Sequence, residues 1–335
     1  MRICRHVKKL APYTPGEQPK AKNAVKLNTN ENPYPPSPRC ATVLRKFDLD
    51  RLRRYPDPVF SELRKELAKL HGAKAENIFV GNGSDEVLAV AARCFVENGE
   101  KIGSLDPSYS LYKTLAAIRD VEWRGNDENA ALFLLTNPNA PTGTAKTKAE
   151  IAAFAKRLRG VLLVDEAYAD FARENCMDLA TAKGNRNTIV MRTLSKSYSL
   201  AGLRLGYCVG PEDLIAAMYK VKDSYNVDAV AQAVALAAVK DQAWMKRNVA
   251  KIVKTRERFA AELERRGWDV MPSEANFVFA KPAHRKAAKL FDDLRGRHIY
   301  VRYFRGPKTG DRLRVTIGTD REMKKLLKAI DELDI

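Results

Sequence analysis

Short apolar runs alternate with amphipathic stretches between about residue 60 and residue 210. Apolar positions at helical spacing predict helices over 61–70 and 85–96. The runs expected to form strands are 78–80, 101–105, 131–135, 161–164, 188–191 and 205–209. Strands that are short, uniformly apolar and separated by helices are typical of an α/β protein whose mostly parallel sheet is buried on both faces. In such sheets ligands bind beyond the carboxyl ends of the strands.

The pattern changes toward both ends of the chain. The N-terminal part is rich in Pro and Asn, and 28–36 predicts an extended arm rather than a helix. Beyond residue 240, a long helix is expected over 242–266, and strands over 275–280 and 312–317 flank a helix over 285–295. The expected parts are an N-terminal arm with a small-domain segment (1–33), a large domain with helices on both faces of its sheet (34–240) and a smaller C-terminal α+β domain (241–335).

The charge of the chain first favours a nucleic-acid binder. Lysine and arginine number 59 against 41 acidic residues, which gives a net charge of +18. The basic residues are scattered, however, with helical spacings such as Lys246, Lys251 and Lys254 that are typical of a solvated helix exterior. We therefore expect no nucleic-acid partner, and a non-catalytic nucleic-acid binder is a remote alternative. The 45% hydrophobic residues exclude a disordered chain.

The spacing of cysteine and histidine indicates neither disulfides nor a metal site. The five cysteines never form a C-x-x-C pair, and the four histidines lack H-x-x-x-H and H-x-H spacing. The N-terminus has no apolar core that would suit a signal peptide. The longest nearly apolar stretch, 229–239, is too short to span a bilayer. We therefore expect a cytoplasmic protein without a metal or a membrane partner.

Three segments carry candidate chemistry. Lys196 follows a predicted strand among hydroxyl residues, and Arg204 stands eight positions later. Asp165 ends an apolar strand, where a carboxylate is costly unless a cation pairs with it, and Tyr168 follows three residues later. Residues 81–86 join a strand to a helix start, which is a natural cup for an anion. This cup lacks the third glycine of a dinucleotide fingerprint and the chain has no P-loop, which disfavours NAD and ATP.

These segments belong to an ordered series of motifs that covers nearly the whole chain. The series is L-N-x-N-E-N-P-Y-P, R-Y-P-D, G-N-G-S-D-E, D-P-S-Y, P-N-x-P-T-G, V-D-E-A-Y, T-L-S-K and L-R-V-T-I-G-T. In this order the chain resembles the histidinol-phosphate aminotransferases, fold-type-I enzymes that depend on pyridoxal phosphate. The resemblance implies an enzyme of histidine biosynthesis that converts imidazole acetol phosphate and glutamate to histidinol phosphate and 2-oxoglutarate. It also implies a homodimer with shared active sites.

The resemblance assigns three catalytic residues. Lys196 would bind pyridoxal phosphate covalently and move a proton between the substrate α-carbon and the cofactor. Asp165 would pair with the protonated pyridine nitrogen, and Tyr168 would hydrogen-bond the phenolic oxygen of the ring. The other cofactor-binding residues implied are Ser84, Asp85, Tyr109, Asn139, Thr193, Ser195 and Arg204, with Tyr55 reaching the neighbouring subunit's cofactor. The substrate-binding residues implied are Tyr13, Asn30, Arg302 and Arg314.

One position departs from the family pattern. Ala140 stands immediately before P-T-G, where most relatives have an asparagine that hydrogen-bonds the phenolic oxygen of the cofactor. Either Asn139 takes this role or Tyr168 fills it alone. Two related activities also stay open, because an aromatic amino-acid aminotransferase and a threonine-phosphate decarboxylase share most of the cofactor motifs and differ at the substrate end.

Overall fold

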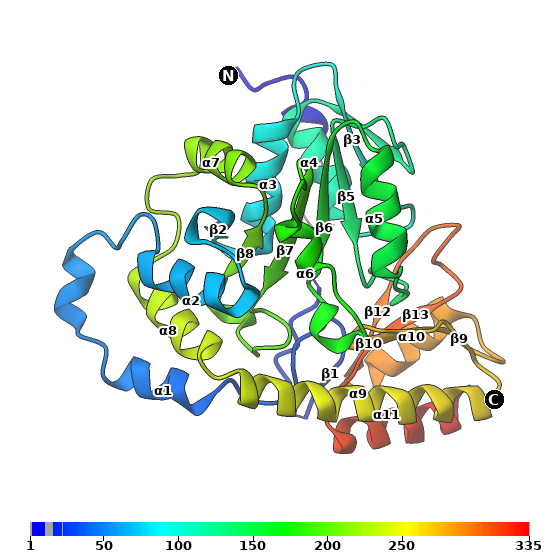
Figure 1. Cartoon of the computed structure of the whole chain (residues 1–335). Coiled ribbons are helices and arrows are strands. Elements are labelled where there is room, and N and C mark those ends of the chain that lie inside the picture. Colours follow the sequence, from blue (N-terminus) through cyan, green and yellow to red (C-terminus); the bar gives the residue numbers. More distant parts are fainter. Residues whose placement is uncertain (1, 11–15, 22, 335) are drawn as a thin grey trace.

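The computed structural model describes residues 2–10, 16–21 and 23–334, and its centre is a seven-stranded sheet (Figure 1). In spatial order the strands are β2 (Ile78–Gly81), β8 (Gly206–Val209), β7 (Thr188–Thr193), β6 (Val161–Asp165), β5 (Leu132–Thr136), β3 (Lys101–Ser104) and β4 (Glu122–Gly125). The pairs from β7 through β4 are parallel, and β8 runs antiparallel to both of its neighbours. The predicted α/β fold with a mostly parallel sheet is therefore confirmed.

Helices cover both faces of this central sheet. One face packs on α3 (Gly83–Phe95), α4 (Leu111–Arg119) and α7 (Glu212–Val221), and the other on α2 (Ser61–His71), α5 (Lys148–Arg157), α6 (Met177–Thr181) and α8 (Ala229–Val239). Successive side chains of a strand point to opposite faces, so in β5 Leu132 and Leu134 join the first core while Phe133 and Leu135 join the second. This explains the uninterrupted apolar runs in the sequence.

A second, antiparallel sheet, the C-terminal sheet, lies at one end of the molecule. Its strands in spatial order are β12 (Arg302–Tyr303), β13 (Leu313–Thr316), β10 (Phe277–Lys281) and β9 (Asp269–Val270), and its helices are α9 (Gln242–Arg265), α10 (Ala287–Gly296) and α11 (Asp320–Leu333). The long α9 runs from the central sheet along this unit (Figure 1). The predicted long helix and both predicted strands are confirmed, whereas the domain boundaries stay predictions.

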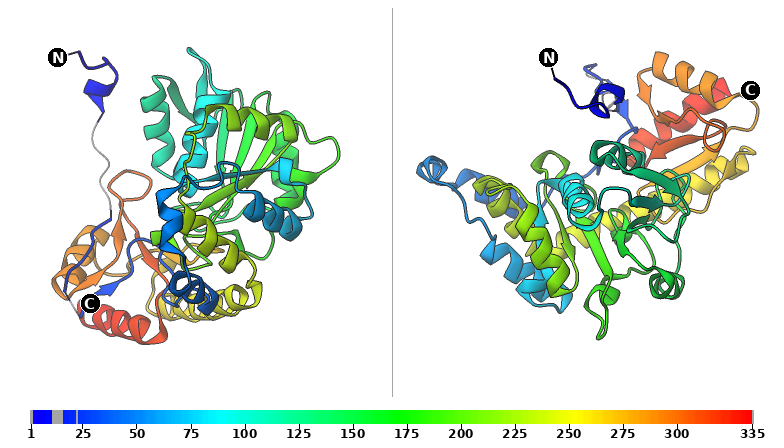
Figure 2. Two further views of the ribbon diagram at one scale, coloured as in Figure 1. Left: turned by 90° about the vertical axis from the view of Figure 1, so that its left-hand side faces the viewer. Right: turned by 90° about the horizontal axis from the view of Figure 1, so that it is seen from above.

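The N-terminal segment is bound to the C-terminal part of the chain. β1 (Val25–Lys26) pairs in parallel with β11 (Ile299–Tyr300), and the blue segment lies beside the orange and red elements (Figure 2). The amide of Leu27 donates to Tyr300 O, and the amide of Thr316 donates to Leu27 O. The segment 28–36 contains no helix, as the sequence predicts. The segment therefore forms an integral strand of the C-terminal part.

The next stretch, residues 38–57, is called the projecting stretch because it extends from the body of the molecule (Figures 1 and 2). It contains α1 (Pro38–Arg45), which begins just after the predicted arm, where Ser37 caps the first turn by accepting from the amide of Arg39. The short 3₁₀ helices are η1 (Val7–Lys9), η2 (Leu49–Arg53), η3 (Ala75–Asn77), η4 (Ala169–Phe171) and η5 (Ala201–Leu203). No helix in the described ranges combines the length and the apolar character that a membrane span requires.

Candidate active site

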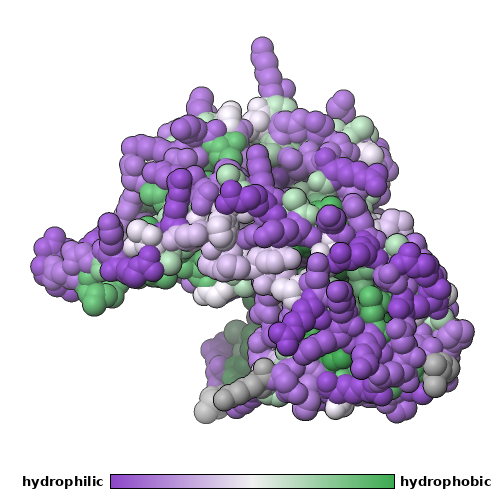
Figure 3. Space-filling view, turned by 90° about the horizontal axis from the view of Figure 1, so that it is seen from below, coloured by the Kyte–Doolittle hydropathy of each residue, from purple (hydrophilic) through white to green (hydrophobic). Residues whose placement is uncertain are grey.

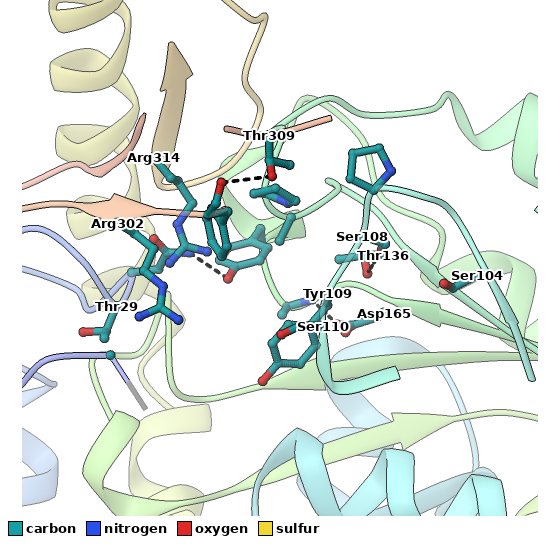
Figure 4. A pocket seen from close by; sticks show the side chains of 18 of the residues that line it. Thr29, Ser104, Ser108, Tyr109, Ser110, Thr136, Asp165, Arg302, Thr309 and Arg314 are labelled. Atoms are coloured by element: carbon teal, nitrogen blue, oxygen red, sulfur yellow. Dashed lines mark hydrogen bonds between the residues drawn. The ribbon is translucent and has the colours of Figure 1, made fainter. Parts of the chain in front are cut away.

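A cavity of about 960 Å³ lies where the central sheet, the C-terminal sheet and the N-terminal segment meet. Four strand ends contribute to its wall: Ser104 of β3, Thr136 of β5, Asp165 of β6 and Thr193 of β7. These are the carboxyl ends at which a parallel sheet binds ligands. Figure 4 shows Thr136 and Asp165 on one side of this cavity and Arg302 and Arg314 on the other.

Lys196 points its amine into this cavity from the loop between β7 and η5. Its Nζ donates to the backbone oxygen of Thr29, 3.2 Å away, so the N-terminal segment covers the amine. Burial, together with the positive charge of Arg314, lowers the pKa of Lys196 to about 8. A substantial fraction of this amine is therefore neutral, and thus nucleophilic, close to neutral pH.

Asp165 lies at the end of β6 with only 4% of its surface exposed. Its Oδ1 accepts from the amide of Ala167 at 3.1 Å, and its Oδ2 accepts from the hydroxyl of Tyr112 at 2.8 Å. Burial raises the pKa of Asp165 to about 6. Among the described residues, no lysine, arginine or histidine forms an ion pair with this carboxylate. The site therefore holds a buried acid without a cationic side-chain partner.

Tyr168 is held by the N-terminal segment. Its hydroxyl accepts from Nδ2 of Asn30 at 2.9 Å, while Oδ1 of Asn30 accepts from the hydroxyl of Thr316, also at 2.9 Å. Asn30 lines the cavity, but it is buried and both ends of its side-chain amide are engaged, by Tyr168 and Thr316. Its expected contact with substrate stays a prediction.

The residues around Ala140 bear on which group could replace the asparagine that most relatives have at this position. Ala140 lines the cavity, but the neighbouring Asn139 does not. The Asn139 amide donates to Pro107 O and to Thr142 Oγ1, and its oxygen accepts from the hydroxyl of Ser108. With these bonds in place Asn139 has no free group to turn into the cavity, which favours the alternative in which Tyr168 acts alone.

The expected anion cup is formed at the start of α3. Ser84, Asp85, Thr193, Ser195 and Arg204 all line the cavity. The Nη2 of Arg204 lies 3.2 Å from Asp85 Oδ2. Gly83 has a φ of +80°, and a Cβ atom at this position would lie only 2.8 Å from the Arg204 guanidinium. The positive φ favours glycine here, and the absence of a Cβ atom leaves room for the Arg204 guanidinium beside the helix start.

The remaining sequence-predicted residues are distributed between the cavity and the surface. Tyr109 lines the cavity, and its ring packs edge-on against Tyr112 with centroids 5.6 Å apart. Arg302 and Arg314 face each other as paired residues of β12 and β13, and Arg314 Nη2 donates to Asn28 O at 2.9 Å. Tyr13 lies outside the described residues.

Tyr55 lies away from the cavity of its own chain. Its side chain is 81% exposed and stacks on Tyr225, with ring centroids 4.4 Å apart. It follows η2 on the projecting stretch, where Leu49 and Leu52 are also exposed. Figure 3 shows that this projection carries apolar surface among hydrophilic side chains. A single chain therefore does not bring Tyr55 to the other site residues.

Two contacts at the site were not foreseen in the sequence. The hydroxyl of Tyr112 contacts Asp165, although nothing in the motif series marks this tyrosine. The loop between β12 and β13 lines the cavity, and its Lys308 donates to Asp106 Oδ2 at 2.8 Å. This ion pair connects the C-terminal part to the central sheet across the cavity.

Comparison with known proteins identifies the family. Residues 22–330 match the family model described as aminotransferase class I and II. The histidinol-phosphate aminotransferase of Geobacter sp. (strain M21) is 45% identical over an alignment of 342 positions, which covers 98% of this chain and 97% of that protein.

Solved structures agree with this match. Histidinol-phosphate aminotransferase from Sinorhizobium meliloti, crystallised in complex with pyridoxal-5′-phosphate, matches with a TM-score of 0.90 and 26% identity over 99% of this chain and 97% of that chain. L-threonine-O-3-phosphate decarboxylase from Porphyromonas gingivalis, at 23% identity and a TM-score of 0.81 over 92% of this chain and 98% of that one, shares the fold alone. The chain belongs to the class I and II aminotransferases and, among them, to the histidinol-phosphate aminotransferase family.

Proposed function

We propose that the protein uses pyridoxal phosphate to transfer an amino group between histidinol phosphate and 2-oxoglutarate. The observation that carries this proposal is the shared cavity of Lys196, whose pKa is lowered to about 8, and Asp165, a buried carboxylate without a cationic side-chain partner. An amine that is easily neutral can attack an aldehyde, and a buried carboxylate can stabilise a protonated ring nitrogen. The 45% identity to a histidinol-phosphate aminotransferase supports the choice of substrate.

The residues of the site fit the cofactor. The phosphate would bind at the start of α3, where backbone amides, the hydroxyls of Thr193 and Ser195, and the guanidinium of Arg204 surround one part of the cavity. Gly83 has no side chain that would crowd the Arg204 guanidinium at this cup. Asp165 would face the ring nitrogen, and Tyr168 would donate to the phenolic oxygen while its own oxygen accepts from Asn30. Tyr109 would stack on the ring.

Lys196 would carry out the proton transfer. When bound, pyridoxal phosphate supplies an aldehyde that takes up the amino group and a ring that accepts the electron pair left at the substrate α-carbon. The amine of Lys196 would remove the proton from that carbon and return it on the cofactor side. Asp165 would keep the ring nitrogen protonated, and its hydrogen bonds from Ala167 and Tyr112 hold the carboxylate in one orientation.

The two arginines of the C-terminal sheet would bind the anionic ends of the substrates. Histidinol phosphate carries a phosphate, and glutamate and 2-oxoglutarate carry two carboxylates. A planar guanidinium can bind either group through two parallel hydrogen bonds. Arg302 and Arg314 lie opposite each other on adjacent strands, so one cavity presents two such groups.

Substrate preference tests this function. We expect kcat/KM for histidinol phosphate to exceed the values for phenylalanine and for threonine phosphate by at least about tenfold, because only this substrate would use the family's full set of contacts. Steady-state kinetics with 2-oxoglutarate as acceptor provide the comparison for phenylalanine, and release of carbon dioxide reports decarboxylation of threonine phosphate. A higher kcat/KM for phenylalanine, or carbon dioxide release as the main reaction, would contradict the assignment.

The lowered pKa of Lys196 gives a pH prediction. Only the neutral amine attacks an aldehyde, so covalent attachment of pyridoxal phosphate to the cofactor-free protein should accelerate with rising pH and be half-maximal near pH 8. Arg314→Gln removes a positive charge that lowers the pKa of Lys196. In this variant the pH of half-maximal attachment should therefore be higher than in wild type. Borohydride trapping followed by mass spectrometry measures the rate. Equal midpoints in both proteins would show that Arg314 does not act on this amine.

The exposed position of Tyr55 supports a homodimer with shared sites. We propose that the projecting stretch packs against a second copy of the chain and that Tyr55 reaches the phosphate of the cofactor bound there. The exposed Leu49, Leu52 and Tyr225 beside it would be buried in that interface. A dimer would then be required for a complete cofactor site.

Tyr55→Phe tests this arrangement. Loss of one hydrogen bond should weaken pyridoxal phosphate binding by about 0.5–1.5 kcal/mol, and by more if the phosphate charge strengthens the bond. Equilibrium titration of the cofactor-free protein measures the affinity, and analytical ultracentrifugation checks that the variant is still dimeric. Tyr225→Phe is the matched control because it removes the other hydroxyl of the same ring pair, and its affinity should be unchanged. Equal affinities for wild type and Tyr55→Phe would place Tyr55 outside the site.

A further inference from the structure

Tyr112 is a buried tyrosine that contacts a catalytic carboxylate without reaching the cavity. It lies in the first turn of α4, is fully buried, and is absent from the lining of the cavity. Its hydroxyl donates to Oδ2 of Asp165 at 2.8 Å. The other oxygen of Asp165 accepts from the amide of Ala167. Two donors therefore hold the carboxylate, and the one from Tyr112 comes from outside the lining of the cavity.

The direction of this hydrogen bond is set by the groups around it. An ionised carboxylate can only accept, so the Tyr112 proton must lie toward Asp165. The Tyr112 oxygen also contacts the hydroxyl of Thr136, at the end of β5, which can donate to it. Burial raises the pKa of Tyr112 well above 10, so its hydroxyl keeps its proton at all working pH values. Tyr112 is thus a permanent donor to Asp165.

The energetic consequence follows from the burial of Asp165. Burial penalises the charged form of this carboxylate, and the hydrogen bond from Tyr112 is the largest effect that opposes the penalty. A carboxylate that lost this donor would bind a proton more readily and would be free to rotate about its last bond. Either change would weaken its attraction for a cation in the cavity.

We infer that Tyr112 is a positioning residue, whose hydroxyl holds Asp165 so that its negative charge faces the cavity where a protonated ring nitrogen binds. This inference rests on the proposed function, because it requires a cofactor with such a nitrogen. Tyr112 acts only through Asp165, and its ring contributes to the core that covers the central sheet.

The test compares two cofactors that differ at one atom. Cofactor-free protein is titrated with pyridoxal phosphate and with its 1-deaza analogue, in which a C–H group replaces the ring nitrogen. For Tyr112→Phe we expect pyridoxal phosphate affinity to fall about tenfold, as for the loss of a hydrogen bond to a charged group, while affinity for the analogue stays within about twofold of wild type. Equal losses for both cofactors would show a merely structural role, and no loss for either would show no role; both results overturn the inference.

A matched control and a second variant complete the test. Tyr219→Phe also removes a tyrosine hydroxyl, one that donates to Ile78 O away from the cavity, and it should leave both affinities unchanged. If Tyr112→Phe fails to fold, Thr136→Val replaces it, because this change keeps Tyr112 and removes the hydroxyl that contacts its oxygen, together with a contact to the Ser108 hydroxyl. A selective loss of pyridoxal phosphate affinity in Thr136→Val, smaller than tenfold, supports the inference, and an unselective change overturns it.

A double-mutant cycle separates this inference from the proposed function. In an Asp165→Asn background, Tyr112→Phe should cause no further loss of selectivity between the two cofactors, because both substitutions interrupt the same interaction. Additive losses would show that Tyr112 acts by another route. Failure of the proposed function has a different signature, since the wild-type protein would then neither bind pyridoxal phosphate nor transfer an amino group.

Discussion

Replacing Lys196 by alanine is expected to lower the rate of amino transfer by at least about 10³-fold. The amine would serve as both the covalent attachment point and the base that moves the proton, and a positioned base alone contributes about 10²–10⁴-fold. Noncovalent binding of pyridoxal phosphate should persist, because the anion cup and Asp165 are unchanged. Stopped-flow absorbance of a single half-reaction with glutamate measures the rate, and equilibrium dialysis measures the retained binding.

A partly buried lysine, Lys222, provides the control for this variant. Burial also lowers the pKa of Lys222, but its amine bonds to the backbone oxygens of Asp223 and Ser224, outside the cavity. Lys222→Ala should keep wild-type rates and should still acquire the mass of the cofactor on Lys196 after borohydride reduction. Lys196→Ala with near wild-type activity, or labelling of a different lysine, would refute the proposed chemistry.

Asp165→Asn is expected to have the second-largest effect, a fall in kcat of at least about 10²-fold. Asparagine has only one acceptor oxygen for the two donors, Ala167 and Tyr112, and it cannot supply the charge that would stabilise a protonated ring nitrogen. The affinity for substrate should change much less, so the loss should appear in kcat rather than in KM. A variant with kcat within about threefold of wild type would exclude this role for Asp165.

The same substitution should change how stability depends on pH. The pKa of Asp165 is raised from 3.8 to about 6 in the folded protein, so the folded state binds a proton more tightly than the unfolded state. The contribution of Asp165 to stability is therefore fully present below about pH 4 and falls as the pH rises to about 6, by on the order of 3 kcal/mol. Urea denaturation of the cofactor-free proteins between pH 4 and pH 7 should show this decline in wild type and not in Asp165→Asn.

The core strands could be predicted because burial on both faces leaves an unbroken apolar run. The exception is β4, which the sequence did not reveal. Its residues Glu122 and Arg124 are exposed, and a strand at the edge of a sheet commonly carries charges that prevent pairing with another chain. The apolar signal is therefore weakest at the edge, where the structural demand for apolar side chains is also weakest.

The sequence could indicate a candidate site residue where that residue belongs to a local motif. Lys196, Asp165 and Arg204 stand in such motifs, and the structure brings them to one cavity. Tyr112 could not be recognised, because a tyrosine on the apolar face of a helix looks like any core residue until the fold places it against Asp165. The same holds for the contact of Asn30 with Tyr168, which depends on residues far apart in the chain.

The attachment of the N-terminal segment to β11 and β13 also determines when the site can form during synthesis. Thr29 and Asn30 are synthesised well before the residues that hold this segment, Tyr300 and Thr316. Domains generally fold in the order of their synthesis, so the central sheet can assemble on the ribosome while Lys196 is still uncovered. The cavity can therefore become complete only after Tyr300 and Thr316 have been synthesised and have bound this segment.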